Sequence, residues 1–129
     1  MAVKIEHSLP YPPAQIWQII GDPGRVDWVP GVAGCDFDGE VRRFVMEGAG
    51  DLAERIVTRD EAQMLLEYSV VESTPPLASH LACIRLEHDD ISTKFIWTTE
   101  VEPTAVEPFI EQGMQASLAK LEEILDRSD

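Results

Sequence analysis

The chain has 129 residues, 44% of them apolar, which is enough for one domain with a sizeable hydrophobic core. Its net charge of −14 would repel phosphate backbones and anionic headgroups, which argues against nucleic-acid binding and membrane-surface binding. This length predicts a single domain over residues 1–129. Because no run of 18 apolar residues is present, we expect no membrane insertion.

The cysteines and the N-terminal residues bear on the compartment. Cys35 and Cys83 are too few for a disulfide framework and favour a reducing compartment. Lys4 and Glu6 place charges where a signal peptide would need an apolar stretch. We therefore expect a cytoplasmic protein. No pair of histidines or cysteines has the spacing of metal ligands, so we expect neither a metal site nor a cofactor.

The first third of the chain predicts a strand and then helical turns. Apolar and polar residues alternate over residues 2–9, as in a half-buried strand. Pro12 and Pro13 suit the first turn of a short helix, whose apolar stripe ends at Gly21. The stretch 22–31 is rich in proline and glycine, so it predicts a structured loop that carries Trp28 and has room for a second helical turn.

The remainder predicts six strands and one long helix. From residue 35 to residue 101, short alternating runs are separated by turn residues, which is typical of antiparallel hairpins. The expected strands cover residues 33–38, 40–46, 51–58, 63–71, 79–87 and 92–101. After Pro103 the apolar residues recur every three or four positions, which predicts an amphipathic helix that starts near Thr104 or Pro108.

This order of elements predicts an α+β domain, in which the terminal helix alone is long enough to cover a seven-stranded antiparallel sheet. The chain resembles the polyketide cyclase/dehydrase branch of the START-like (SRPBCC) superfamily from Ala2 to about Leu125. The residues that carry the resemblance are Pro13, Trp17, Gly21-Asp22, Trp28-Val29-Pro30, Val41-Arg42, Glu54-Arg55, Tyr68 and Thr93 to Trp97.

The resemblance implies a helix-grip fold, in which a curved seven-stranded sheet surrounds the C-terminal helix and two short helices lie between the first two strands. It also implies a cavity that binds hydrophobic small molecules. Some members of the superfamily cyclise polyketides, whereas others only bind or carry a ligand. No shared set of catalytic residues follows, because one fold hosts unrelated functions.

Hairpin pairing predicts which side chains face the cavity, because opposed residues on antiparallel strands share a face. A turn over residues 60–62 would place Glu54 opposite Tyr68, Ile56 opposite Leu66 and Arg55 opposite Glu67. A turn at Asp89-Asp90 would place Leu86 opposite Thr93, Ala82 opposite Trp97 and His80 opposite Thr99. A turn at Gly48-Ala49-Gly50 would place Arg42, Phe44 and Met46 of the preceding strand on the same inward face. The expected ligand-binding residues are Trp28, Arg42, Phe44, Met46, Glu54, Ile56, Met64, Leu66, Tyr68, His80, Ala82, Phe95, Trp97, Met114 and Leu118.

Glu54 and His80 are the candidate catalytic residues, since inward titratable groups in a cleft can move protons. For Glu54 two interpretations stay open. An unpaired carboxyl group would be neutral and costly to ionise, whereas a contact with Arg42 would keep it ionised and give it a structural role. His80 is either a titrating group near the cavity mouth or a polar plug at the start of its strand.

The resemblance and these residues together suggest three functions. The first is binding of a hydrophobic, aromatic or polyketide-like small molecule. The second is an enzyme of the cyclase or dehydrase type that uses Glu54 or His80 as acid or base, although no sequence motif defines its catalytic residues. The third is a protein-interaction or homodimerisation module, for which Leu81, Cys83 and Ile96 would form an outward apolar patch.

Overall fold

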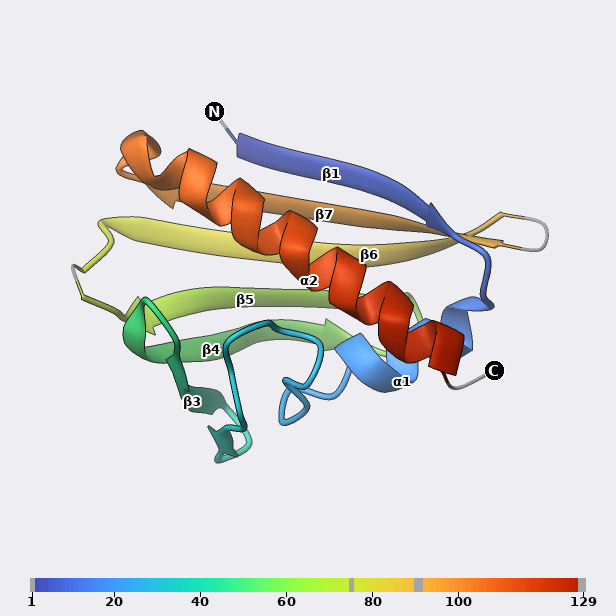
Figure 1. The fold of residues 1–129 in the computed structure, drawn as a ribbon, viewed down its shortest axis with the longest axis horizontal. Coiled ribbons are helices and arrows are strands. Elements are labelled where there is room, and N and C mark those ends of the chain that lie inside the picture. Colours follow the sequence, from blue (N-terminus) through green and yellow to red (C-terminus); the bar gives the residue numbers. More distant parts are fainter. Residues whose placement is uncertain (1, 75, 90–91, 128–129) are drawn as a thin grey trace.

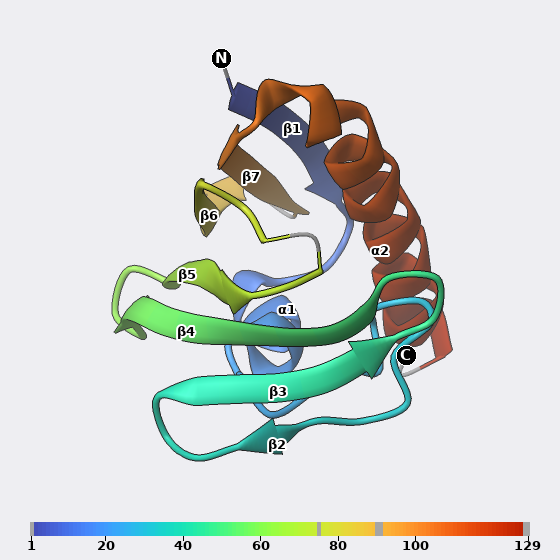
Figure 2. The same cartoon turned by 90° about the vertical axis from the view of Figure 1, so that its left-hand side faces the viewer.

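The computed structural model describes residues 2–74, 76–89 and 92–127. Seven antiparallel strands form one sheet in the order β1-β7-β6-β5-β4-β3-β2. The sheet curls so that its concave side faces one long helix (Figure 1, Figure 2). The strands are β1 (Ala2–Leu9), β2 (Asp36–Phe37), β3 (Val41–Met46), β4 (Gly50–Asp60), β5 (Leu65–Glu72), β6 (Ser79–Asp89) and β7 (Ser92–Glu102).

The long helix α2 (Glu107–Arg127) follows a 3-10 turn, η1 (Thr104–Val106), so the helical region begins at Thr104 and Pro108 lies in the first turn of α2. The predicted apolar stripe is confirmed, since α2 buries Met114, Ser117, Leu118, Leu121, Ile124 and Leu125. A sheet that grips such a helix is the START-like helix-grip arrangement. None of the helices described within residues 2–74, 76–89 and 92–127 is long and apolar enough to cross a membrane.

One short helix, α1 (Pro13–Ile20), lies between β1 and β2 in the described chain, so the second predicted helix there is wrong. Turns replace it over residues 22–31, where Pro23 and Pro30 lack the N–H groups that a helix needs. The turns are nevertheless ordered by hydrogen bonds, such as that from the Val29 backbone N–H to the Val26 carbonyl oxygen at 3.0 Å. The loop therefore holds Trp28 in a buried position.

The predicted pairings of Glu54, Arg55 and Ile56 with β5, and of β6 with β7, are wrong by two residues, yet the predicted faces of these residues are correct. Glu54 lies opposite Val70, and Ile56 lies opposite Tyr68, because the turn after β4 takes four residues, 61–64. Strand β6 continues to Asp89 and β7 starts at Ser92; Asp90 lies outside the described residues. Because side chains alternate between the two faces of a strand, a pairing shifted by two residues leaves the same side chains facing inward. The other corrected pairs are Arg55 with Ser69, Leu86 with Phe95, Ala82 with Thr99, His80 with Val101, and Arg42 with Glu54.

A β-bulge near Val57 breaks the alternation that the sequence predicts for β4. The register shifts between Ile56 and Thr58, and beyond it Arg59 lies opposite Leu66. The Arg59 guanidinium packs over the Trp17 ring at 5.3 Å and donates from Nε to the Gly21 carbonyl oxygen. The bulge therefore turns an arginine toward α1 and ties this helix to the sheet.

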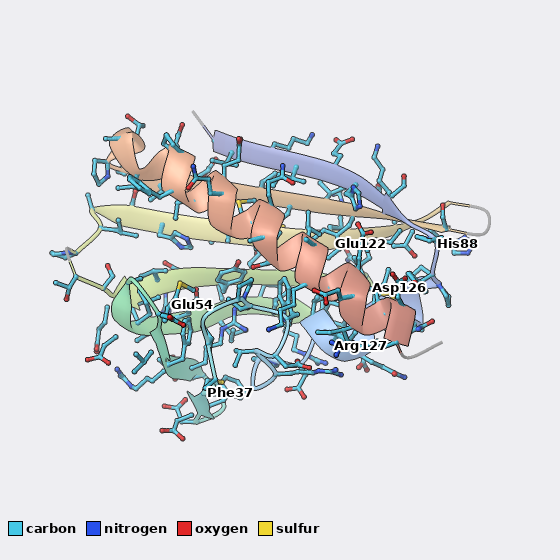
Figure 3. All side chains as sticks on the ribbon, viewed as in Figure 1. Phe37, Glu54, His88, Glu122, Asp126 and Arg127 are labelled. Atoms are coloured by element: carbon cyan, nitrogen blue, oxygen red, sulfur yellow. The ribbon has the colours of Figure 1, made fainter. Side chains whose placement is uncertain are left out.

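Two side-chain contacts attach the C-terminal part of α2 to the N-terminal segment. Tyr11 donates its hydroxyl hydrogen to Asp126, and His7 Nε2 contacts the Glu122 carboxylate. Figure 3 shows Glu122 and Asp126 on this part of α2. Thr93 also donates from Oγ1 to the Tyr11 carbonyl oxygen at 2.6 Å. These contacts fix the C-terminal end of α2 against β1 and the turn that follows it.

Two glycine substitutions are expected to change stability in opposite directions. An alanine Cβ at Gly21 would lie 2.5 Å from Cε2 and 2.7 Å from the carbonyl oxygen of Trp17. Gly21→Ala should therefore destabilise the fold by about 2 kcal/mol. Gly113→Ala should stabilise it by about 1 kcal/mol, because nothing lies within 4 Å and alanine favours a helix interior. Urea unfolding measures both; equal effects would contradict the packing described for Trp17.

Candidate functional site

The concave side of the sheet and α2 enclose one apolar core, here called the helix–sheet core. Most of the sequence-predicted ligand residues lie in it, with Ile56 and Met64 partly buried at its margin. Phe44 and Met46 do not join it; they pack with Val26 in a second, smaller core. The predicted ligand residues that the helix–sheet core brings together and buries are Trp28, Leu66, Tyr68, Ala82, Phe95, Trp97, Met114 and Leu118.

Arg42 and Glu54 form an ion pair across β3 and β4, next to this core. Arg42 Nε donates to Glu54 Oε1 at 2.7 Å, and only 7% and 14% of the two side chains are exposed. Arg42 Nη1 also donates to the Pro23 carbonyl oxygen at 3.3 Å. Glu54 lies on β4, opposite Arg42 of β3 (Figure 3). The interpretation of Glu54 as an unpaired acid is therefore wrong, because its carboxylate has a cation within hydrogen-bond distance.

Tyr68 on β5 is the residue that the other polar groups surround. The Arg42 guanidinium carbon lies 4.9 Å from the centre of its ring, and the His80 ring lies 6.1 Å away, centre to centre. Burial, together with the Glu54 charge, raises the pKa of the Tyr68 hydroxyl. The hydroxyl group therefore stays protonated and can donate a hydrogen bond. We call Arg42, Glu54, Tyr68, His80 and Trp97 the Tyr68 cluster.

The His80 side chain replaces a backbone acceptor at the point where the pairing of β5 with β6 ends. Its Nδ1 accepts a hydrogen bond from the Val70 backbone N–H at 3.0 Å, just beyond the last backbone pair, Tyr68 with Ala82. The neutral ring therefore carries its hydrogen on Nε2. Burial lowers the pKa of His80 from 6.5 to about 4. The ring is thus neutral near pH 7, and a base with so low a pKa accepts protons weakly.

Two tryptophans meet beside Tyr68. Trp28, from the loop, packs on Trp97 of β7 with ring centres 5.5 Å apart, and Phe95 meets Trp97 edge to face at 5.9 Å. Trp97 Nε1 is buried and has no hydrogen-bond partner of normal geometry among the described residues. The Tyr68 hydroxyl is the polar group beside it, and the indole N–H, directed at that oxygen, lowers the pKa of Tyr68 against the larger effect of burial. A buried donor without a partner of normal geometry costs free energy.

Among the hollows on the surface of the described residues, two lie away from the Tyr68 cluster. One, of about 550 Å³, lies along β2, β3 and β4 and is lined by Cys35, Val45 and Glu72 among others. The other, of about 450 Å³, lies at the loop after β5 and is lined by Val70, Thr74 and Leu77 among others. Neither is lined by the Tyr68 cluster. The apolar residues predicted to contact a ligand between α2 and the sheet pack together in the helix–sheet core.

The described side chains do not favour a nucleophilic cysteine or a metal site. Burial raises the pKa of both the Cys35 and Cys83 thiols, which keeps them in the less reactive protonated form. No group of three or more His, Cys, Asp or Glu side chains within the described ranges is placed to hold a metal ion. What the Tyr68 cluster offers is hydrogen bonding: the indole N–H, the imidazole Nε2–H and the tyrosine hydroxyl are all donors.

One contact of the site was missed from the sequence, and one surface patch was overestimated. The Pro23 carbonyl oxygen accepts from Arg42, and no sequence signal identifies a backbone acceptor in an irregular loop. The expected outward apolar patch is also reduced, because Ile96 is buried at 8% exposure while Leu81 remains 37% exposed. Ile96 lies between Glu6 and Arg85 on the neighbouring strands, and the long stems of such side chains can cover it.

Comparison with known proteins agrees with the fold. The family model described as polyketide cyclase / dehydrase and lipid transport matches residues 2–126. Protein XoxI from Bacillus cereus is 18% identical over 99% of this chain and 98% of its own, with a TM-score of 0.88. A Thermobifida fusca protein is 26% identical over 98% of this chain and 93% of its own, with a TM-score of 0.80. A START superfamily protein from Mycobacterium smegmatis is 13% identical over 99% of both chains, with a TM-score of 0.82. No curated protein matches the chain.

Proposed function

Because the chain belongs to the polyketide cyclase / dehydrase and lipid transport family, we propose that it binds a hydrophobic small molecule between α2 and the sheet, beside Trp28, Tyr68 and Trp97. The observation that supports this most is a group of polar side chains set into the helix–sheet core with hydrogen-bonding capacity left unused. A core that served stability alone would gain from replacing such groups with apolar side chains.

Trp28 is the side chain whose movement would admit the ligand. It lies on a loop of turns rather than on a strand or helix, and it covers Trp97. Loops open at a lower free-energy cost than packed strands do. A ligand with an aromatic ring could take the position of the Trp28 ring and keep the contact with Trp97.

Binding is favoured over acid–base catalysis. Glu54 is paired with Arg42, and His80 uses its basic nitrogen to accept the Val70 N–H. Both groups therefore act first as structural partners. A polyketide-like or lipid ligand is in keeping with the family description, and the free Cys35 and Cys83 thiols favour the cytosol as the compartment.

Titration with N-phenyl-1-naphthylamine, a neutral fluorescent probe of apolar sites, tests the proposal. We expect saturable binding in the micromolar range and a rise in Tm. Trp28→Ala should tighten binding about fivefold, because the ligand then takes its place beside Trp97 without displacing an aromatic contact worth on the order of 1 kcal/mol. Phe109→Ser removes a surface phenylalanine, 74% exposed at the start of α2, and should leave binding unchanged. Absence of saturable binding, or a loss in Phe109→Ser alone, would contradict the proposal.

A further inference from the structure

Trp97 presents an unused hydrogen-bond donor inside the proposed binding site. Trp97 is 4% exposed, and its Nε1–H has no acceptor of normal geometry among the described residues; the Tyr68 hydroxyl is the polar group beside it. Buried donors in native proteins are nearly always paired, so an unpaired one calls for an explanation. A ligand that accepts a hydrogen bond from this donor would explain it, because the donor lies in the proposed binding site.

The neighbours of Trp97 offer more donors than acceptors. Tyr68 keeps its hydroxyl hydrogen, and His80 carries its hydrogen on Nε2, because Nδ1 accepts from Val70. The acceptor that the Tyr68 cluster sets against these donors is Glu54 Oε2, since Oε1 already accepts from Arg42. The group that completes the site is therefore an acceptor.

The charge of the Tyr68 cluster is already balanced. Arg42 is neutralised by Glu54 at 2.7 Å, while Tyr68 and His80 are neutral near pH 7. An anionic ligand would lose its hydration without gaining an unpaired cation, and this cost is large in a buried site. The surrounding protein, with a net charge of −14, adds further repulsion. A neutral acceptor is the group that fits.

We propose that the Trp97 indole N–H donates a hydrogen bond to an acceptor oxygen of the ligand, so that the site selects neutral apolar molecules carrying a carbonyl-type oxygen. The inference rests on the proposed binding function and adds the residue that sets its selectivity. Trp28, which packs on Trp97, is the side chain that the ligand replaces there. Fatty-acid carboxylates and plain hydrocarbons are the ligands that the site disfavours.

A matched ligand pair separates this hydrogen bond from general hydrophobic binding. In 2-acetylnaphthalene and 2-ethylnaphthalene, a carbonyl replaces a methylene group in otherwise similar molecules. Because the ketone partitions less into any apolar site, the quantity to measure is the ratio of the two Kd values in each protein. Between wild type and Trp97→Phe this ratio should change about tenfold, the usual worth of one buried hydrogen bond.

Trp17→Phe is the control, because it also removes a buried, unpartnered indole N–H but lies against Gly21 and Arg59. It should leave the ratio of Kd values unchanged. If Trp97→Phe does not fold, the indole N–H resonance of Trp97 in wild type decides: the ketone should shift it downfield and ethylnaphthalene should not.

Three outcomes would overturn the inference. In the first, both ligands bind, but the ratio of Kd values is the same in wild type and Trp97→Phe. In the second, the ketone does not shift the Trp97 resonance downfield relative to ethylnaphthalene. In the third, neither ligand nor the fluorescent probe binds, and the proposed binding function fails together with the inference. The first two leave the binding function standing, so the two failures can be told apart.

Discussion

Glu54→Gln is expected to lower the free energy of unfolding by about 3 kcal/mol near neutral pH, since breaking one side of a buried ion pair leaves the other charge uncompensated. The Arg42 guanidinium would keep its contact with the Pro23 carbonyl oxygen and with the Tyr68 ring, but would lose its carboxylate. Urea unfolding of wild type and variant at pH 7 measures the difference.

Two controls identify the ion pair as the cause. The double variant Arg42→Met with Glu54→Gln removes the uncompensated charge, so it should recover about half of the loss or more. Glu61→Gln removes a carboxylate that is 75% exposed and 3.6 Å from Arg59, and it should cost less than about 0.5 kcal/mol. Unchanged or higher stability in Glu54→Gln would contradict the account, because it is the result expected of an unpaired carboxyl group.

His80 is expected to make the fold lose stability as the pH falls. In the folded protein burial lowers its pKa to about 4, whereas in the unfolded chain the value is near 6.5. Between these values the unfolded chain binds a proton that the folded protein does not, so the contribution is complete above pH 6.5 and is lost on the way to pH 4. The shift corresponds to at most about 3 kcal/mol, and we expect about 2 kcal/mol because the ring keeps some contact with solvent.

His80→Asn isolates this effect from the titration of other groups. The Asn side-chain oxygen can take the place of Nδ1 and accept the Val70 N–H, but it does not bind a proton in this range. Free energies of unfolding at several values from pH 4 to pH 7.5 should fall about 2 kcal/mol less in the variant than in wild type. Parallel curves would show that His80 does not titrate between folded and unfolded states as described.

The sequence predicts the faces of the strands better than their pairing. The pairings expected for the middle of β4 with β5, and for β6 with β7, differ from the observed ones by two residues, and a shift by two returns each side chain to the same face. Arg42, Glu54, Tyr68 and His80 therefore point inward as predicted, and Arg42 lies directly opposite Glu54. Hydrophobic alternation fixes the face, whereas turn length, which fixes the pairing, depends on local backbone geometry.

Features that depend on backbone geometry could not be predicted. The bulge near Val57, which turns Arg59 toward α1, leaves no mark in the pattern of apolar residues. The turns over residues 22–31 make backbone hydrogen bonds between residues three apart, as a helical turn does, so the sequence pattern does not separate the two. Most important for function, an unpaired Trp97 Nε1 can be recognised only once every neighbouring acceptor has been located.

The most direct test of a ligand site at the Tyr68 cluster is a ¹H–¹⁵N spectrum of the three tryptophan indole groups during titration with 2-acetylnaphthalene. Phe variants at positions 17, 28 and 97 assign the three resonances. Binding between α2 and the sheet should move the Trp28 and Trp97 signals together and saturably, while the signal of Trp17, which packs against Gly21 and Arg59, stays in place. Saturable binding that leaves Trp28 and Trp97 unmoved would place the ligand elsewhere and contradict the account.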